Sequence, residues 1–209
     1  MKNIIIFCLL LVHFSLHSFS NENFYKYGHQ SSGTNIFGET GIITVPNAKT
    51  ASEGSLFFYF SQNSIFKFGA LTIAPFDWME ASYFYYRPSD IWWGNPSGRG
   101  LYLDKGFSVK FSKNISNDFT LAAGLSDFSG TGLFGREYIV GTYEKDFFRV
   151  TLGLGFGKFV SNDGFSNPLK VFSNRFANRQ SIYEDYDVGG TLNQNQWFTG
   201  DATDRKSVV

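Results

Sequence analysis

Short runs in which apolar and polar positions alternate recur along the middle of the chain. The clearest covers residues 147–157, where one parity is apolar and the other is small or polar. The apolar positions are Phe148, Val150, Leu152, Leu154 and Phe156. A period of two is typical of a β-strand with one apolar face. Residues 106–113 show the same division more briefly, so both segments are predicted to be strands.

Runs of this kind follow one another at short intervals and are separated by turn-forming residues such as Pro75-Phe76-Asp77 and residues 114–117. Closely spaced strands with turns between them predict an antiparallel meander and an all-β fold. A shorter strand is expected at residues 41–45, where Pro46 ends it. The main predicted strands are residues 55–62, 67–74, 78–87, 106–113, 119–125, 137–145 and 147–157.

Periodicity alone leaves open what the apolar face contacts. In a water-soluble β-sandwich it would face a shared core, whereas in an outer-membrane β-barrel it would face lipid. The two clearest strands approach the roughly 9–11 residues that cross a bilayer at a tilt. Aromatic residues also gather near predicted strand ends, at Trp78, residues 83–86 and Trp92-Trp93, as in interfacial girdles. The pattern favours an outer-membrane β-barrel or the first part of one, in contact with outer-membrane lipid.

The N-terminal 20 residues have the order of a secretory signal. Lys2 precedes an apolar stretch over residues 4–16, and Ser18-Phe19-Ser20 offers a small-x-small cleavage pattern. Polar residues such as His13 interrupt the stretch, which argues against a transmembrane anchor. The sequence therefore predicts a signal peptide at 1–20, and an exported protein of a Gram-negative outer membrane. The predicted regions after it are a flexible lead-in at 21–40, a barrel region at 41–160, and a long loop with a truncated continuation at 161–209.

The last six residues support that idea of truncation. Asp204-Arg-Lys-Ser-Val-Val209 is what GAT CGG AAG AGC GTC GTG, a sequencing-adapter sequence, would encode. The natural protein is therefore expected to continue beyond about Thr203.

Composition removes several function classes. Cleavage before Asn21 would remove Cys8 and two of the three histidines, leaving His29. Thiol chemistry, disulfides and Cys or multi-His metal sites are then excluded, so no metal and no cofactor are expected. The chain carries 18 Lys+Arg and 18 Asp+Glu, which gives no basic footprint for nucleic acid.

Charged residues near predicted strand ends are the candidates for polysaccharide or lumen contacts. If these strand ends meet, they would form a charged cluster in the mouth of a barrel. The Gly-rich connection at 127–135 is interpreted first as a bend or bulge that needs positive φ. No two carboxylates are singled out as a catalytic pair, and a Ser-His-Asp triad would depend on His29 in the lead-in. We expect no enzymatic activity. The candidate residues are Asp104, Lys105, Asp127, Arg136 and Glu137.

Three segments carry a resemblance to a known family. They are Leu103-Asp-Lys-Gly-Phe-Ser-Val-Lys-Phe111, Leu125-Ser-Asp-Phe-Ser-Gly-Thr-Gly-Leu-Phe-Gly-Arg-Glu-Tyr138 and Val150-Thr-Leu-Gly-Leu-Gly-Phe-Gly157. The chain resembles the YjbH family of exopolysaccharide biosynthesis proteins from about Gly41 to about Gly200. Further support comes from residues 41–48 and 71–80, Asn167-Pro168 and Arg175-Phe176.

The resemblance implies an outer-membrane β-barrel that supports production or export of an extracellular polysaccharide, with the polymer and other envelope export proteins as partners. Family members are typically several times longer, and the resemblance supplies no catalytic residues. Two alternatives stay open: a general porin-like channel and a secreted carbohydrate-binding β-sandwich.

Overall fold

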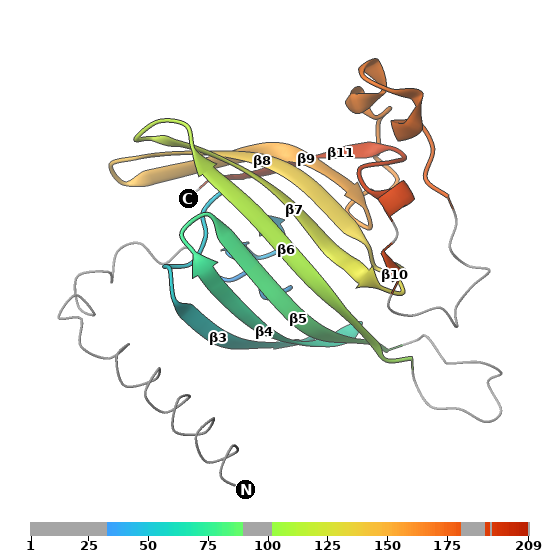
Figure 1. Cartoon of the computed structure of the whole chain (residues 1–209), viewed down its shortest axis with the longest axis horizontal. Coiled ribbons are helices and arrows are strands. Elements are labelled where there is room, and N and C mark those ends of the chain that lie inside the picture. Colours follow the sequence, from blue (N-terminus) through green and yellow to red (C-terminus); the bar gives the residue numbers. More distant parts are fainter. Residues whose placement is uncertain (1–32, 90–101, 181–190, 193, 209) are drawn as a thin grey trace, which may run out of the picture. The chain divides into compact units, whose positions relative to one another are not determined.

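A curled antiparallel β-sheet dominates the structure, a computed structural model (Figure 1). Eight strands pair in the order β11-β9-β8-β7-β6-β5-β4-β3, and the short β10 (Thr191–Leu192) pairs with β7. The all-β antiparallel meander predicted from the sequence is confirmed. The long strands are β3 (Ser55–Gln62), β4 (Phe66–Phe76), β5 (Met79–Pro88), β6 (Asp104–Asn114), β7 (Phe119–Gly130), β8 (Arg136–Lys145), β9 (Phe148–Gly157) and β11 (Ala202–Val208).

The structure describes residues 33–89, 102–180, 191–192 and 194–208, which belong to one compact unit, Ser32–Val209. The predicted signal peptide, residues 21–32 of the predicted lead-in, and Trp92-Trp93 lie outside the described residues. Within these ranges β3 and β11 are the two edges of the sheet, and they do not pair with each other. The sheet is therefore not closed.

Residues 41–45 do not form the single strand expected from the sequence. They contribute to a small hairpin of β1 (Gly41–Ile42) and β2 (Val45–Pro46). Ile43 has a φ of 51° in the turn between them. A β-branched residue with positive φ is unusual, so periodicity gave no signal for a turn at this position.

Residues 33–51 lie against one face of the sheet, called here the inner face (Figure 1). Thr72 Oγ1 donates to the carbonyl oxygen of Gly38 at 2.8 Å, and Thr142 Oγ1 accepts from the amide of Ala48 at 2.8 Å. Residues 33–40 therefore differ from the flexible lead-in expected there. Their packing depends on contacts with distant strands, which local sequence patterns do not report.

Tyr138 shows how closely the inner face is packed. Its side chain is fully buried in a cluster with Ala48, Val140 and other apolar groups. Its cross-strand partner on β7 is Gly124, where an added Cβ would lie 2.2 Å from Cζ of Tyr138. The absence of a side chain at Gly124 makes room for the aromatic ring.

We therefore expect Gly124→Ala to lower the free energy of unfolding by about 1–3 kcal/mol through overpacking. The matched control is Gly69→Ala on the opposite face, where an added Cβ meets nothing closer than 3.9 Å. Denaturant titration followed by circular dichroism measures both. Equal unfolding midpoints for the two variants would contradict this packing.

The Gly-rich connection after β7 is a bulge followed by a turn, as expected from its sequence. The β6–β7 register shifts between Phe107 and Ser108, and Asp127 has a φ of 56°. Gly132 has a φ of 69° in the following turn. The bulge redirects the end of β7 and turns the Asp127 side chain toward the inner side of the connection.

The two ends of the sheet differ in their connections. Residues 77–78, 115–118 and 146–147 form tight turns at one end, called here the short-turn end. The other end, called the long-loop end, carries the short connections 63–65 and 131–135 and the long connections 89–103 and 158–201.

The last of these connections contains structure of its own. It includes the 3₁₀ turns η2 (Pro168–Val171), η3 (Asn174–Phe176) and η4 (Gln194–Gln196). The side-chain nitrogen of Asn167 lies 2.8–3.0 Å from three backbone oxygens, those of Phe176, Phe198 and Gly200. The region expected as a long loop is thus folded around one buried amide, at least in its described parts.

Candidate functional site

The outer face of the sheet, opposite residues 33–51, is apolar and exposed. Leu152 is 61% exposed and Phe58 is 73% exposed, although both lie within regular strands. Water-soluble monomers rarely expose contiguous apolar patches of more than a few hundred Å². This face is therefore built to contact an apolar partner. Other exposed members are Leu56, Phe60, Leu71, Ile73, Phe107, Leu121 and Ile139.

Aromatic side chains gather on strands β3 to β6 of this face. Near the short-turn end, the rings of Phe76 and Trp78 stack at 5.1 Å between centroids, and Trp78 stacks on Phe111 at 6.2 Å. Farther along the strands, Tyr83 contacts Phe107 at 5.2 Å. Strands β7 to β9 carry aliphatic residues on this face, such as Leu121, Ile139 and Leu152, called here the aliphatic band. Exposed aromatic and aliphatic side chains on one face of a sheet are typical of a membrane-facing barrel wall.

The inner face mixes apolar clusters with polar groups, and it contains a buried ion pair. Lys110 Nζ lies 3.4 Å from Glu80 Oε2, and each side chain is 1% exposed. Glu80 also accepts hydrogen bonds from the amide and hydroxyl of Thr40 and from the amide of Ala51. Lys110 donates to the carbonyl oxygen of Thr40 at 3.1 Å. Buried charges need such partners, so this pair fixes residues 40–51 to β5 and β6.

A second set of inner-face contacts holds the segment just before Thr40. Ser126 on β7 donates a hydrogen bond to the Glu39 carboxylate. The Arg136 guanidinium lies 3.4 Å from the centroid of the Phe37 ring, a cation–π contact. We call Glu39, Thr40, Glu80, Lys110, Ser126 and Arg136 the inner polar cluster. It joins the N-terminal segment to strands β5 through β8.

Asp104 and Asp127 anchor the connection between β7 and β8. Thr131 Oγ1 donates to Asp104 Oδ1 at 3.1 Å, and the amide of Phe134 donates to Asp127 Oδ2 at 3.2 Å. The second oxygen of each carboxylate is buried and has no hydrogen-bond partner within the described ranges. Both carboxylates therefore order a loop at the long-loop end and lie beneath its surface.

The five candidates do not form one cluster, because neighbouring strand residues point to opposite faces. Asp104, Asp127 and Arg136 are buried on the inner side. Lys105 is exposed on the outer face. Glu137 lies at a strand position that faces outward, but it is only 2% exposed because the connection 158–201 covers it. The structure therefore brings Asp104, Asp127 and Arg136 close enough to interact electrostatically, without Lys105 and Glu137, while a role of each residue in polysaccharide contact stays a prediction.

Glu137 binds Arg179 through two hydrogen bonds, of 2.7 Å and 2.9 Å. It also accepts from the amide of Phe198 at 3.3 Å. This bidentate pair is charge-assisted and fixes the connection 158–201 to β8. The two residues are 42 positions apart in the sequence, so no local motif predicts their contact.

Arg179→Gln is expected to release this connection, because it leaves the Glu137 carboxylate buried with fewer partners. Loss of about 1–3 kcal/mol of local stability should follow. Limited digestion with a protease selective for aromatic residues should cut sooner near Phe172 and Phe176. Lys170→Gln, at an exposed position on η2, is the control and should digest like the wild type. Unchanged digestion of Arg179→Gln would contradict the anchoring role.

Sequence patterns missed the most buried polar residues of the inner face. Lys110 lies on the polar parity of its strand, which was a visible signal, but its partner Glu80 follows only from the β5–β6 register. Within the described ranges, no group of three or more His, Cys, Asp or Glu is placed to hold a metal ion. The same ranges contain no helix of the length and apolarity needed to span a membrane.

Comparison with known proteins gives one family and one relative. Residues 33–204 match the profile of the YjbH family, described as "Exopolysaccharide biosynthesis protein YbjH". The chain is 29% identical over 172 residues to the "Uncharacterized lipoprotein YjbH" of Escherichia coli (strain K12). That alignment covers 80% of this chain and 24% of the relative, so the chain spans about a quarter of the relative's length. No solved structure matches the chain.

Proposed function

Since the chain belongs to the YjbH family of exopolysaccharide biosynthesis proteins, we propose that it forms part of an outer-membrane β-barrel. In this proposal the barrel supports production or secretion of an extracellular polysaccharide and catalyses no reaction. Its partners are outer-membrane lipid, the polysaccharide and other envelope export proteins.

One observation carries the membrane part of the proposal, namely the large exposed apolar surface of the outer face. The inner face buries an ion pair and several hydroxyl groups beside its apolar clusters, whereas the outer face exposes leucine, isoleucine and aromatic side chains. A β-sandwich in water would cover this apolar parity with a second layer. A barrel wall would instead expose it to lipid.

The connections give the proposed wall a direction. Outer-membrane barrels have short turns on the periplasmic side and longer loops outside. The tight turns at 77–78, 115–118 and 146–147 would then lie in the periplasm. The Escherichia coli relative is named a lipoprotein, which agrees with an exported, envelope-associated protein.

The inner face suggests how the protein would serve a polymer. It is hydrogen-bonded to residues 33–51 over most of its width, so this segment would narrow the interior of a barrel. A polysaccharide would meet amide, hydroxyl and carboxylate groups near the long-loop end, and aromatic faces on which sugar rings can stack. No specific observation favours a general porin-like channel over this role.

Fractionation of the full-length gene product tests the proposal. The protein is expected in the outer-membrane fraction after a carbonate wash, with a gel band that shifts on boiling as a closed barrel does. Deletion of the gene should lower secreted polysaccharide while leaving cytoplasmic polymer precursors in place. A protein that stays soluble without detergent, or a deletion strain with normal polysaccharide, would overturn the respective part of the proposal.

A further inference from the structure

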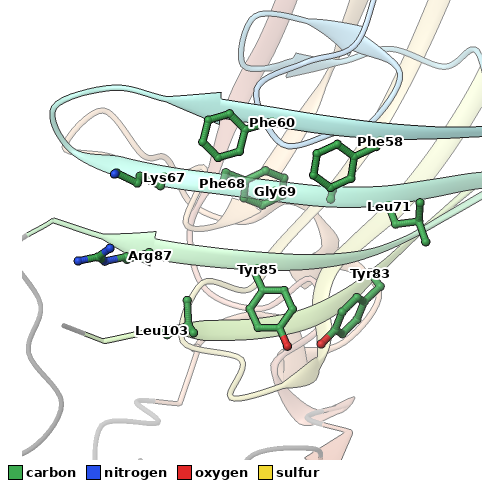
Figure 2. A pocket seen from close by; sticks show the side chains of 11 residues that line it. Phe58, Phe60, Lys67, Phe68, Gly69, Leu71, Tyr83, Tyr85, Arg87 and Leu103 are labelled. Atoms are coloured by element: carbon green, nitrogen blue, oxygen red, sulfur yellow. The ribbon is translucent and has the colours of Figure 1, made fainter. Parts of the chain in front are cut away.

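The outer face contains a groove of about 450 Å³ toward the long-loop end of β3, β4 and β5 (Figure 2). Its floor is at Gly69, which has no side chain, and β3 and β5 supply rings on either side. An added Cβ at Gly69 would meet nothing closer than 3.9 Å, so the space above it is open. The walls are almost entirely apolar. They are formed by Phe58, Phe60, Leu71, Tyr83, Tyr85 and Leu103.

Two cations stand at one end of this groove. Lys67 and Arg87 are cross-strand partners on β4 and β5, and both line the groove and are exposed (Figure 2). Lys105 is exposed on the same face of the next strand. Within the described ranges, no carboxylate forms an ion pair with any of the three.

Like charges placed directly opposite each other destabilise a sheet unless an anion lies between them. Exposed acidic side chains lie in turns of the short-turn end, for example Asp77 and Asp146. The long-loop end of the outer face thus combines an apolar slot with basic side chains that no carboxylate of the described residues pairs with. A molecule complementary to both features has an apolar chain and an anionic head.

We propose that this groove binds a phosphorylated membrane lipid. One acyl chain lies over Gly69 between the aromatic walls, and a phosphate of the headgroup bridges Lys67 and Arg87. Arginine and lysine both bind phosphate well, and arginine does so through paired hydrogen bonds. The inference rests on the proposed function for its placement of the outer face in the membrane, and it adds a specific lipid site to that face.

A lipid fits the groove better than the other occupants. A free phosphate would leave the apolar slot unfilled. A sugar chain would find few hydrogen-bonding groups there, because the walls offer polar atoms mainly at the tyrosine hydroxyls. A lipid in the leaflet at the long-loop end has its head at the height of the two cations and its chains along the apolar outer face.

The test uses full-length protein extracted from the outer membrane, stripped of lipid in detergent, and mixed with lipid A that carries both phosphates. Native mass spectrometry counts the bound lipid. The double variant Lys67→Gln/Arg87→Gln should weaken binding about tenfold, because it removes both phosphate contacts. Gly69→Leu should weaken binding similarly by filling the slot. The control Lys113→Gln/Lys145→Gln removes two exposed cations near the short-turn end and should bind like the wild type.

Three results would overturn the proposal: wild-type binding by the double variant, equal loss in the control, or equal binding of lipid A without phosphates. Displacement by millimolar inorganic phosphate or by a soluble oligosaccharide would assign the groove to a different ligand and overturn it as well. The same preparations report separately on the proposed function. Protein that is in the outer-membrane fraction and heat-modifiable, yet binds lipid equally in all variants, contradicts the lipid site alone.

Discussion

Replacing Glu80 with glutamine is expected to destabilise the fold by about 3–5 kcal/mol, the usual cost of leaving a buried charge without its partner. Lys110 is 1% exposed and would keep its positive charge beside a neutral amide. Glu80 also accepts hydrogen bonds from Thr40 and Ala51, which would weaken at the same time. The N-terminal segment should then detach from β5 and β6. The measurement is the urea midpoint of the purified protein in detergent.

Two further variants separate the buried pair from a general effect of charge. Glu53→Gln removes an exposed carboxylate and should leave the free energy of unfolding within about 0.5 kcal/mol of the wild type. Adding Lys110→Met to Glu80→Gln removes the orphaned charge and should recover part of the loss, because a neutral pair of similar volume avoids desolvation. A double variant less stable than the single one would show that the pair is not coupled as described.

Ile139→Arg is expected to prevent assembly into the outer membrane. Ile139 lies on the outer face of β8, near the middle of the strands, where its cross-strand partners are Ala123 and Leu154, and it is 36% exposed. An arginine at the bilayer midplane of a barrel costs about 2–4 kcal/mol, whereas the same change on a water-exposed strand is nearly neutral. The folded, heat-modifiable band in outer membranes should therefore fall sharply.

The matched control is Ile115→Arg, in the turn between β6 and β7. Ile115 is 53% exposed, so exposure alone predicts that arginine is tolerated at both positions. The membrane account predicts normal assembly for Ile115→Arg and failure for Ile139→Arg. Normal assembly of both variants would mean that the outer face meets water.

Most strand positions were predictable because apolar and polar residues alternate along them in the sequence. The prediction at residues 55–62 coincides with β3, and β4 to β9 differ from prediction mainly at their ends. β11 was not predicted, because it lies in residues 161–209, which were expected to form a long loop and truncated continuation. The Gly-rich connection at 127–135 was also recognisable, since glycine is the residue that most readily adopts positive φ. The hairpin at residues 41–46 was not, because Ile43 takes a backbone conformation that its side chain disfavours.

Periodicity could not show which face of the sheet is covered, since an alternating strand has the same pattern in a sandwich and in a barrel wall. In the structure, residues 33–51 cover the inner face through contacts with strands far along the chain. Pairs such as Glu80 with Lys110 exist only once the register is set. The candidate Lys105 is also placed differently from the expectation. As the strand neighbour of Asp104, it has its side chain on the opposite, outer face.

The claim that the outer face contacts lipid is tested most directly by spin labels at two positions of a cysteine-free background of the full-length protein, reconstituted into bilayers. Labels are attached at Leu152→Cys, which is 61% exposed in the aliphatic band, and at Ile115→Cys, which is 53% exposed in a turn. The measured quantity is the collision rate of each label with oxygen and with a water-soluble nickel chelate. If the outer face contacts lipid, the label at position 152 should collide often with oxygen and rarely with the nickel chelate. The label at position 115 should show the reverse preference. Strong nickel collisions at both positions would contradict it and place the apolar face in water.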